Sequence, residues 1–288
     1  MRMTVHELQA RLHDPNIKIL DATWSLPQSQ PDLTEGYIPG AQRFDIDVCA
    51  DQDAPTAHMA PNADTFTQYM DKLSIDHTNH VVCYDRHGVF SAPRAWWTFR
   101  RFGHKYVYIL DGGLPAWIRA GFKTSTDMHS IPHPTPRSTP HHADAVAPQT
   151  YQMSTPLIGN VMTMDEILNS LQTDQPMNIL DARPRKRFMG EAPEPRAGLR
   201  SGHIPCSRSF PLSDVLTPQG TLKSISVIKR MIDGFGLDPY MPIITTCGSG
   251  ITAAGLAFIL DELGFETIRL YDGSWAEWGA STAPISPH

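Results

Sequence analysis

The sequence of 288 residues has no long basic run and no apolar stretch near the ~18 residues that a membrane-spanning helix needs. A formal net charge of −6 argues further against a dedicated nucleic-acid surface. The first residues, MRMTVHELQARL, predict an amphipathic helix and lack the apolar segment of a secretory signal. These absences predict a soluble cytoplasmic protein with neither a nucleic-acid nor a membrane partner.

Cysteine is scarce, and no two of the four residues form a C-x-x-C pair. The spacing supports neither a zinc ribbon nor a thioredoxin-type motif, and in a reducing compartment all four would be free thiols. We expect no metal ion and no organic cofactor; His141 and His142 fall in a proline-rich segment without supporting ligands. The cysteines are Cys49, Cys83, Cys206 and Cys247.

What the chain does contain is an internal repeat, with equivalent motifs roughly 160 positions apart and in the same order. The repeat predicts a first domain at 1–122, a linker rich in proline at 123–158, and a second domain at 159–288. The paired motifs are NIKILDATW (16–24) with MNILDARP (177–184), EGYIPGAQRFDID (35–47) with SGHIPCSRSFPLSD (201–214), and ILDGGLPAW (109–117) with LYDGSWAEW (270–278).

Within each half, short apolar runs alternate with helical patterns. This alternation predicts an α/β fold in which a parallel sheet is covered by helices on both faces. Ligands of such folds bind beyond the carboxyl ends of the strands. The expected strands are NIKIL, HVVCYD and KYVYIL in the first half and MNIL, MPIITT and TIRLY in the second.

Cys247 lies at one such strand end, in the stretch TTCGSGITAAG (245–255). A loop with Gly248 and Gly250 can turn several N–H groups inward, and the following helix adds its positive end, so a thiolate would be stabilised there. The alternative is a small apolar residue at the junction. The repeat places Asp85 at the equivalent position, so we expect an inactive first domain and chemistry in the second.

A phosphatase loop of the C-x₅-R type has the same outline. Such a loop needs an arginine six residues after the cysteine to hold a phosphoryl group. That position is Ala253, which excludes this class.

The repeat, the first half with Asp85 at the position of the loop cysteine, and the loop CGSGITA together resemble the two-domain rhodanese-like sulfurtransferases, and so do DGSWAEWG, GHIP and SAPRAWW. The CGSG form is similar to the 3-mercaptopyruvate branch, whereas thiosulfate-preferring members carry a CRKGVT-type loop. The resemblance implies two tandem rhodanese-like domains. It also implies transfer of sulfur from 3-mercaptopyruvate, through a persulfide on Cys247, to a thiol such as thioredoxin or to cyanide, with release of pyruvate.

The resemblance assigns further site residues. The segment FDIDVCADQDAPTAHM (44–59) implies an acidic residue and a histidine, Asp47 and His58, which Ser249 would complete as a relay. The segment RFMGEAPEPR (187–196) implies that Arg187 and Arg196 bind the substrate carboxylate, a group that arginine suits geometrically. The loop residues expected to bind substrate are Gly248, Gly250, Ile251 and Thr252.

Several alternative interpretations of the sequence remain at this point. Asp47 and His58 could be surface residues, and the two arginines could belong to a solvated loop. The enzyme could use thiosulfate as its donor, or the chain could be a non-catalytic persulfide carrier. Cys206 departs from the usual GHIPG and adds a thiol of unknown role.

Overall fold

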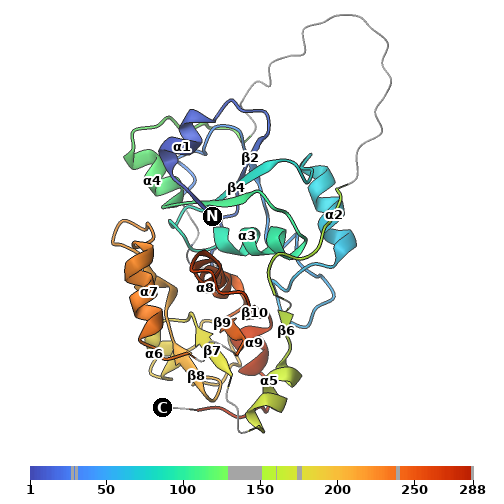
Figure 1. Ribbon diagram of the computed structural model, residues 1–288, viewed down its shortest axis with the longest axis vertical. Helices are drawn as coiled ribbons and strands as arrows, with labels where there is room; N and C mark the ends of the chain where they lie inside the picture. The colour runs from blue at the N-terminus through green and yellow to red at the C-terminus, as the bar shows by residue number, and fades with distance from the viewer. Residues whose placement is uncertain are drawn as a thin grey trace, which may run out of the picture.

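The computed structural model describes residues 1–26, 29, 32–128, 151–159, 161–173, 177–237 and 241–286 (Figure 1). Most of the expected linker, with His141 and His142, lies outside these residues. The end of that segment does return to the first half, where the Tyr151 ring meets Phe66 edge to face at 5.3 Å.

The first half contains a five-stranded parallel sheet in the order β1-β5-β4-β2-β3. Its central strands carry apolar residues on both faces because both faces are covered. Val81 and Cys83 face one core cluster, and Val82 and Tyr84 face another. The strands are β1 (Arg2–Met3), β2 (Ile17–Asp21), β3 (Ala41–Arg43), β4 (His80–Tyr84) and β5 (Val107–Leu110).

Two helices cover each face of this sheet. The outer pair is α1 (Val5–Ala10) and α4 (Gly113–Arg119), and the inner pair is α2 (Ala63–Lys72) and α3 (Ala92–Arg101). The side chains of Thr4 and Glu7 form a capping box that starts α1. The predicted amphipathic helix is therefore shorter than expected, because residues 2–3 pair with β5 as an edge strand.

The second half repeats this topology, with a five-stranded parallel sheet in the order β6-β10-β9-β7-β8. The strands are β6 (Val161–Met162), β7 (Asn178–Asp181), β8 (Ser207–Ser209), β9 (Ile243–Thr246) and β10 (Ile268–Tyr271). The helices are α5 (Met164–Leu171), α6 (Arg185–Phe188), the short 3₁₀ helix η1 (Leu212–Val215), α7 (Ile225–Asp233), α8 (Ile251–Glu262) and α9 (Ser274–Trp278).

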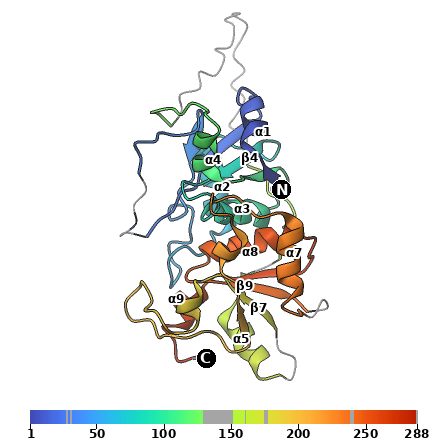
Figure 2. The same ribbon diagram turned by 90° about the vertical axis from the view of Figure 1, so that its left-hand side faces the viewer.

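Helices α3 and α8 pack against each other between the two sheets (Figures 1 and 2). Helix α8 is apolar around most of its surface because one side faces its own sheet and the other faces α3. The rings of Trp96 and Phe258 meet there at 5.0 Å, and they hold equivalent positions in the two repeats. The inner faces of both sheets consequently share one hydrophobic cluster.

The expected fold class is confirmed: each half is a parallel sheet flanked by helices on both faces. Among the described residues, no helix is long and apolar enough to cross a membrane.

Candidate active site between the two halves

The residues 247–250, here called the thiol loop, join β9 to α8. Cys247 directly follows β9 and is buried. The Oγ atom of Ser274 accepts the N–H groups of Cys247 at 3.2 Å and Gly250 at 3.1 Å, and it donates to the Tyr271 carbonyl at 2.8 Å. Ser274 thus fixes the loop from beneath. Sequence reasoning missed this residue, although it stands in the repeated DGSWAEW motif.

A cavity of about 320 Å³ opens beside Cys247. Its walls come from both halves. The first half contributes Trp24, Leu26 and Phe90, and the second contributes the thiol loop, the start of α8 and residues from the segments 182–196 and 212–216. Of the ten residues expected in the site, the cavity is lined by Arg187, Arg196, Cys247, Gly248, Ser249, Ile251 and Thr252.

Two guanidinium groups converge on the thiol loop. A methyl group placed on Gly248 would lie 3.1 Å from Arg187 Nη2 and 3.8 Å from Arg196 Nη1. The carboxylate of Glu194 orients Arg187 by accepting from its Nε at 3.1 Å and from Nη2, and it also binds Arg183 at 2.9 Å. Glu194 is a further residue that the sequence did not reveal.

Burial lowers the pKa of Arg196, an effect that Cys247 nearby opposes. Arginine remains a cation even so, because its unperturbed pKa lies far above neutrality. The position of Arg196 therefore brings fixed positive charge to the mouth of the thiol loop.

Asp47 and His58 also lie where the two halves of the chain meet. The His58 Nδ1 atom contacts Asp47, and Nε2 lies 3.1 Å from Arg196 Nη2. Because arginine can only donate, Nε2 is an acceptor, and Nδ1–H donates to Asp47. This hydrogen bond lowers the pKa of Asp47. The Trp24 ring packs edge to face on His58 at 4.8 Å.

Of the two hydrogen bonds expected in a relay from Ser249 through His58 to Asp47, the one between His58 and Asp47 is present. Within the described part of the chain, no hydrogen bond joins Ser249 to His58, and the His58 Nε2 atom instead accepts from Arg196. Ser249 nevertheless lines the cavity beside Cys247.

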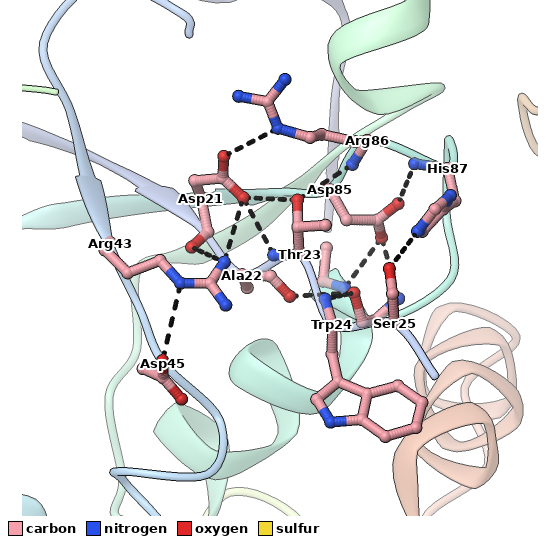
Figure 3. A network of polar contacts seen from close by, with 12 residues as sticks. Asp21, Ala22, Thr23, Trp24, Ser25, Arg43, Asp45, Asp85, Arg86 and His87 are labelled. Carbon is pink, nitrogen blue, oxygen red and sulfur yellow. Dashed lines mark hydrogen bonds and ion pairs between the residues drawn. The ribbon is translucent and has the colours of Figure 1, made fainter. Parts of the chain in front are cut away.

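Asp85 follows β4 as Cys247 follows β9. One oxygen of its carboxylate accepts the N–H of His87 at 2.8 Å, and the other accepts those of Phe90, Ser91 and Ala92 at 2.8–2.9 Å. Figure 3 shows Asp85 among these contacts, beside Thr23 and Trp24. The loop at this position in the repeat therefore binds an anion, and in the first half the anion is its own side chain.

The other cysteines lie in different surroundings. Burial raises the pKa of Cys49 to about 12 and raises that of Cys83 still further. Cys206 is exposed and adopts a left-handed φ of 64°, where the first half has Gly40 at 80°. Cys206 therefore occupies a turn position that glycine adopts without strain.

Comparison with known proteins agrees with this geometry. The model of the rhodanese-like domain matches residues 4–120 and 163–281, so the chain belongs to the rhodanese-like family and contains two such domains. The crystal structure of SseA from Escherichia coli, a 3-mercaptopyruvate sulfotransferase by its description, superimposes with a TM-score of 0.77 at 32% identity, covering 95% of this chain and 98% of that one. The crystal structure of the Tum1 protein of Saccharomyces cerevisiae superimposes with a TM-score of 0.82 at 29% identity, covering 99% of this chain and 97% of that one.

Curated relatives narrow the class to sulfurtransferases. The 3-mercaptopyruvate sulfurtransferase of Mus musculus is 37% identical, and the alignment covers 96% of this chain and 90% of the mouse protein. The enzyme of the same name from Escherichia coli K12 is 36% identical, with 97% of this chain and 95% of that protein covered. The mitochondrial thiosulfate/3-mercaptopyruvate sulfurtransferase 1 of Arabidopsis thaliana is 38% identical over 99% and 77%.

Proposed function

We propose that the protein transfers sulfur from 3-mercaptopyruvate to a thiol or cyanide acceptor through a persulfide on Cys247. The observation that carries the proposal is the convergence of Arg187 and Arg196 on the thiol loop. An α-keto acid that presents its carboxylate to these two groups places its own sulfur beside Cys247.

In the first half-reaction, the Cys247 thiolate attacks the substrate sulfur. An S–S bond forms, the C–S bond breaks, and its electron pair leaves as the enolate of pyruvate, which takes up a proton. In the second, an acceptor thiolate or cyanide attacks the outer sulfur, and the Cys247 thiolate is released. The N–H groups of the thiol loop stabilise negative charge on sulfur in both steps.

We assign the proton transfers to Ser249, His58 and Asp47. In the ligand-free geometry, Arg196 covers Nε2 of His58. A substrate carboxylate competes for Arg196, and its binding would free Nε2 to complete the link to Ser249. The relay would then form with the donor in place.

The test is Cys247→Ser, with Cys206→Ser as the matched control because Cys206 is exposed and does not line the cavity. Cys206→Ser should retain full turnover. Cys247→Ser should release no pyruvate and gain no sulfur on the peptide that contains residue 247, with its melting temperature unchanged. Pyruvate formation by a folded Cys247→Ser variant would eliminate the mechanism.

Thiosulfate is the second candidate donor, since the Arabidopsis relative is named for both donors. The neutral Gly248 and Ser249 favour 3-mercaptopyruvate, because a compact dianion gains more from cations next to the thiolate. A persulfide carrier would release at most one pyruvate per chain, so multiple turnover separates it from an enzyme. We propose thioredoxin as one thiol acceptor and the cytoplasm as the location.

A further inference from the structure

The two halves meet through equivalent residues, since Trp96 and Phe258 hold equivalent positions and their rings contact each other. Equivalent aspartates cross this interface in opposite directions. Asp272 accepts the N–H of Ala60 at 2.6 Å, and Asp111 accepts the N–H of Leu222 at 2.8 Å. A loop of each half is thus held against the other half by the same kind of contact.

His58 and Gly220 hold equivalent positions, each two residues before the N–H that crosses the interface. Both adopt the left-handed backbone conformation, with φ values of 71° and 76°. Glycine tolerates this region, whereas a residue with a Cβ is strained there. The surroundings of His58 must therefore hold its backbone in place.

Arg94 of α3 provides this restraint. Its Nη1 donates to Asp272 Oδ1 at 2.6 Å, and its Nη2 donates to the carbonyl oxygen of His58. Arg94 and Asp272 are 2% and 1% exposed, so the pair is shielded from water. The guanidinium also lies over the Trp97 ring at 4.7 Å.

Among the described residues of the second half, no equivalent contact is formed. The residue of α8 equivalent to Arg94 is Leu256, which cannot hold the carbonyl of Gly220. The Gly220 carbonyl oxygen instead packs against Gly88, where a Cβ placed on Gly88 would lie 2.5 Å from it. Arg94, His58 and Cys247 are thus each found in only one of the two repeats.

We propose that Arg94 is a positioning residue for the sulfur-transfer reaction and acts through His58. It holds the strained backbone of His58 so that the imidazole stands between Asp47 and Arg196, the second of which lines the cavity. The inference rests on the function proposed above, since it requires that His58 takes part in that reaction.

The experiment is a double-mutant cycle on kcat/KM for 3-mercaptopyruvate. Arg94→Lys keeps the charge opposite Asp272, but its shorter side chain with a single nitrogen does not reproduce the two separate hydrogen bonds that Nη1 and Nη2 make to Asp272 and to the His58 carbonyl. It should lower kcat/KM about 10- to 150-fold, the equivalent of about 1.5–3 kcal/mol for a charged hydrogen bond. His58→Gly should lower kcat/KM at least about 100-fold while keeping the melting temperature, because glycine fits the backbone conformation.

The decisive variant carries both changes. With the imidazole gone, Arg94→Lys should alter kcat/KM less than about threefold. Asp111→Asn serves as the control because it weakens the equivalent interface contact, the one to the Leu222 N–H. It should lower the melting temperature while leaving kcat/KM near the wild-type value.

An equal loss from Arg94→Lys with and without His58 would show a general structural role and overturn the inference, with the proposed function intact. Full activity of His58→Gly would instead remove His58 from the mechanism and the inference with it. Only turnover by Cys247→Ser would overturn sulfur transfer through this thiol.

Discussion

Gly248 and Gly250 stand two residues apart in the thiol loop, yet a side chain would meet different obstacles at each. At Gly248 a methyl group would face the flexible end of Arg187. At Gly250 the φ is +79°, and a methyl group would lie 2.6 Å from the Asp272 carboxylate. The first site tolerates a Cβ only if the Arg187 side chain shifts, and the second does not tolerate it.

We therefore expect Gly248→Ala to raise KM for 3-mercaptopyruvate several-fold with little change in stability. Gly250→Ala should lower the free energy of unfolding by about 1–3 kcal/mol through backbone strain. Urea denaturation and steady-state kinetics of the two variants measure this contrast. A marked destabilisation by Gly248→Ala, with KM unchanged, would contradict the placement of Arg187.

The residues of the site differ in how far the sequence reveals them. Cys247 is visible because its loop combines local signals: a strand, glycines and a helix start. The roles expected for Asp47, His58 and Arg196 rested on family resemblance, and the structure brings these three side chains into one chain of contacts. Arg94 escaped notice because its partner Asp272 lies 178 positions away, beyond any local pattern.

At the scale of elements, Arg187 lies in α6 and Arg196 in the segment that follows this helix, and the two arginines have unequal neighbours. Glu194 holds Arg187, whereas Arg196 reaches His58. Arg187→Ala should raise KM for 3-mercaptopyruvate about 10- to 150-fold, since one charged hydrogen bond contributes about 1.5–3 kcal/mol. Arg196→Ala should change both KM and kcat, because it also removes the partner of His58.

Thiosulfate, which has no carboxylate, is the control donor for this comparison. Each variant should lose less activity with thiosulfate than with 3-mercaptopyruvate. Equal losses with both donors would mean that the arginines maintain the local structure or act on any anionic donor through their charge, and would contradict a specific role in binding the carboxylate.

The central elements were predictable, and the edges were not. Six strands and the long helices follow from apolar runs and helical periodicity. The edge strands β1 and β6 contain two residues each, and β3 and β8 contain three, so they are too short to show a pattern. They form because a neighbouring strand is already in place to pair with them.

At the scale of the whole molecule, His104 joins the return of the chain at Tyr151 to the first domain. Its Nδ1 lies 2.7 Å from the Tyr151 hydroxyl, and its Nε2 lies 2.9 Å from the Asn79 carbonyl oxygen. Burial lowers the pKa of His104 to about 4, so the folded protein keeps the ring neutral.

The unfolded chain binds a proton at this histidine near pH 6.5, and the folded chain binds it only near pH 4. Stability from this group is thus complete above pH 6.5 and falls as the pH drops to 4, by about 3 kcal/mol. His104→Gln should be less stable than wild type at pH 7, with a gap that narrows toward pH 4. The exposed His13→Gln is the control, and urea unfolding curves that stay equally far apart for His104→Gln would refute the assignment.

The covalent attachment of Asp85 to its own anion-binding loop has a consequence for the cavity. A diffusing ligand must give up its translational freedom to order the loop that receives it, whereas a tethered carboxylate orders residues 87–92 without that loss. The N–H groups of Phe90 and Ser91 are bound in this way, and the Ser91 hydroxyl in turn accepts the N–H of Trp24. The first half, which has no reactive thiol, thereby gives the second a wall that is rigid before any substrate arrives.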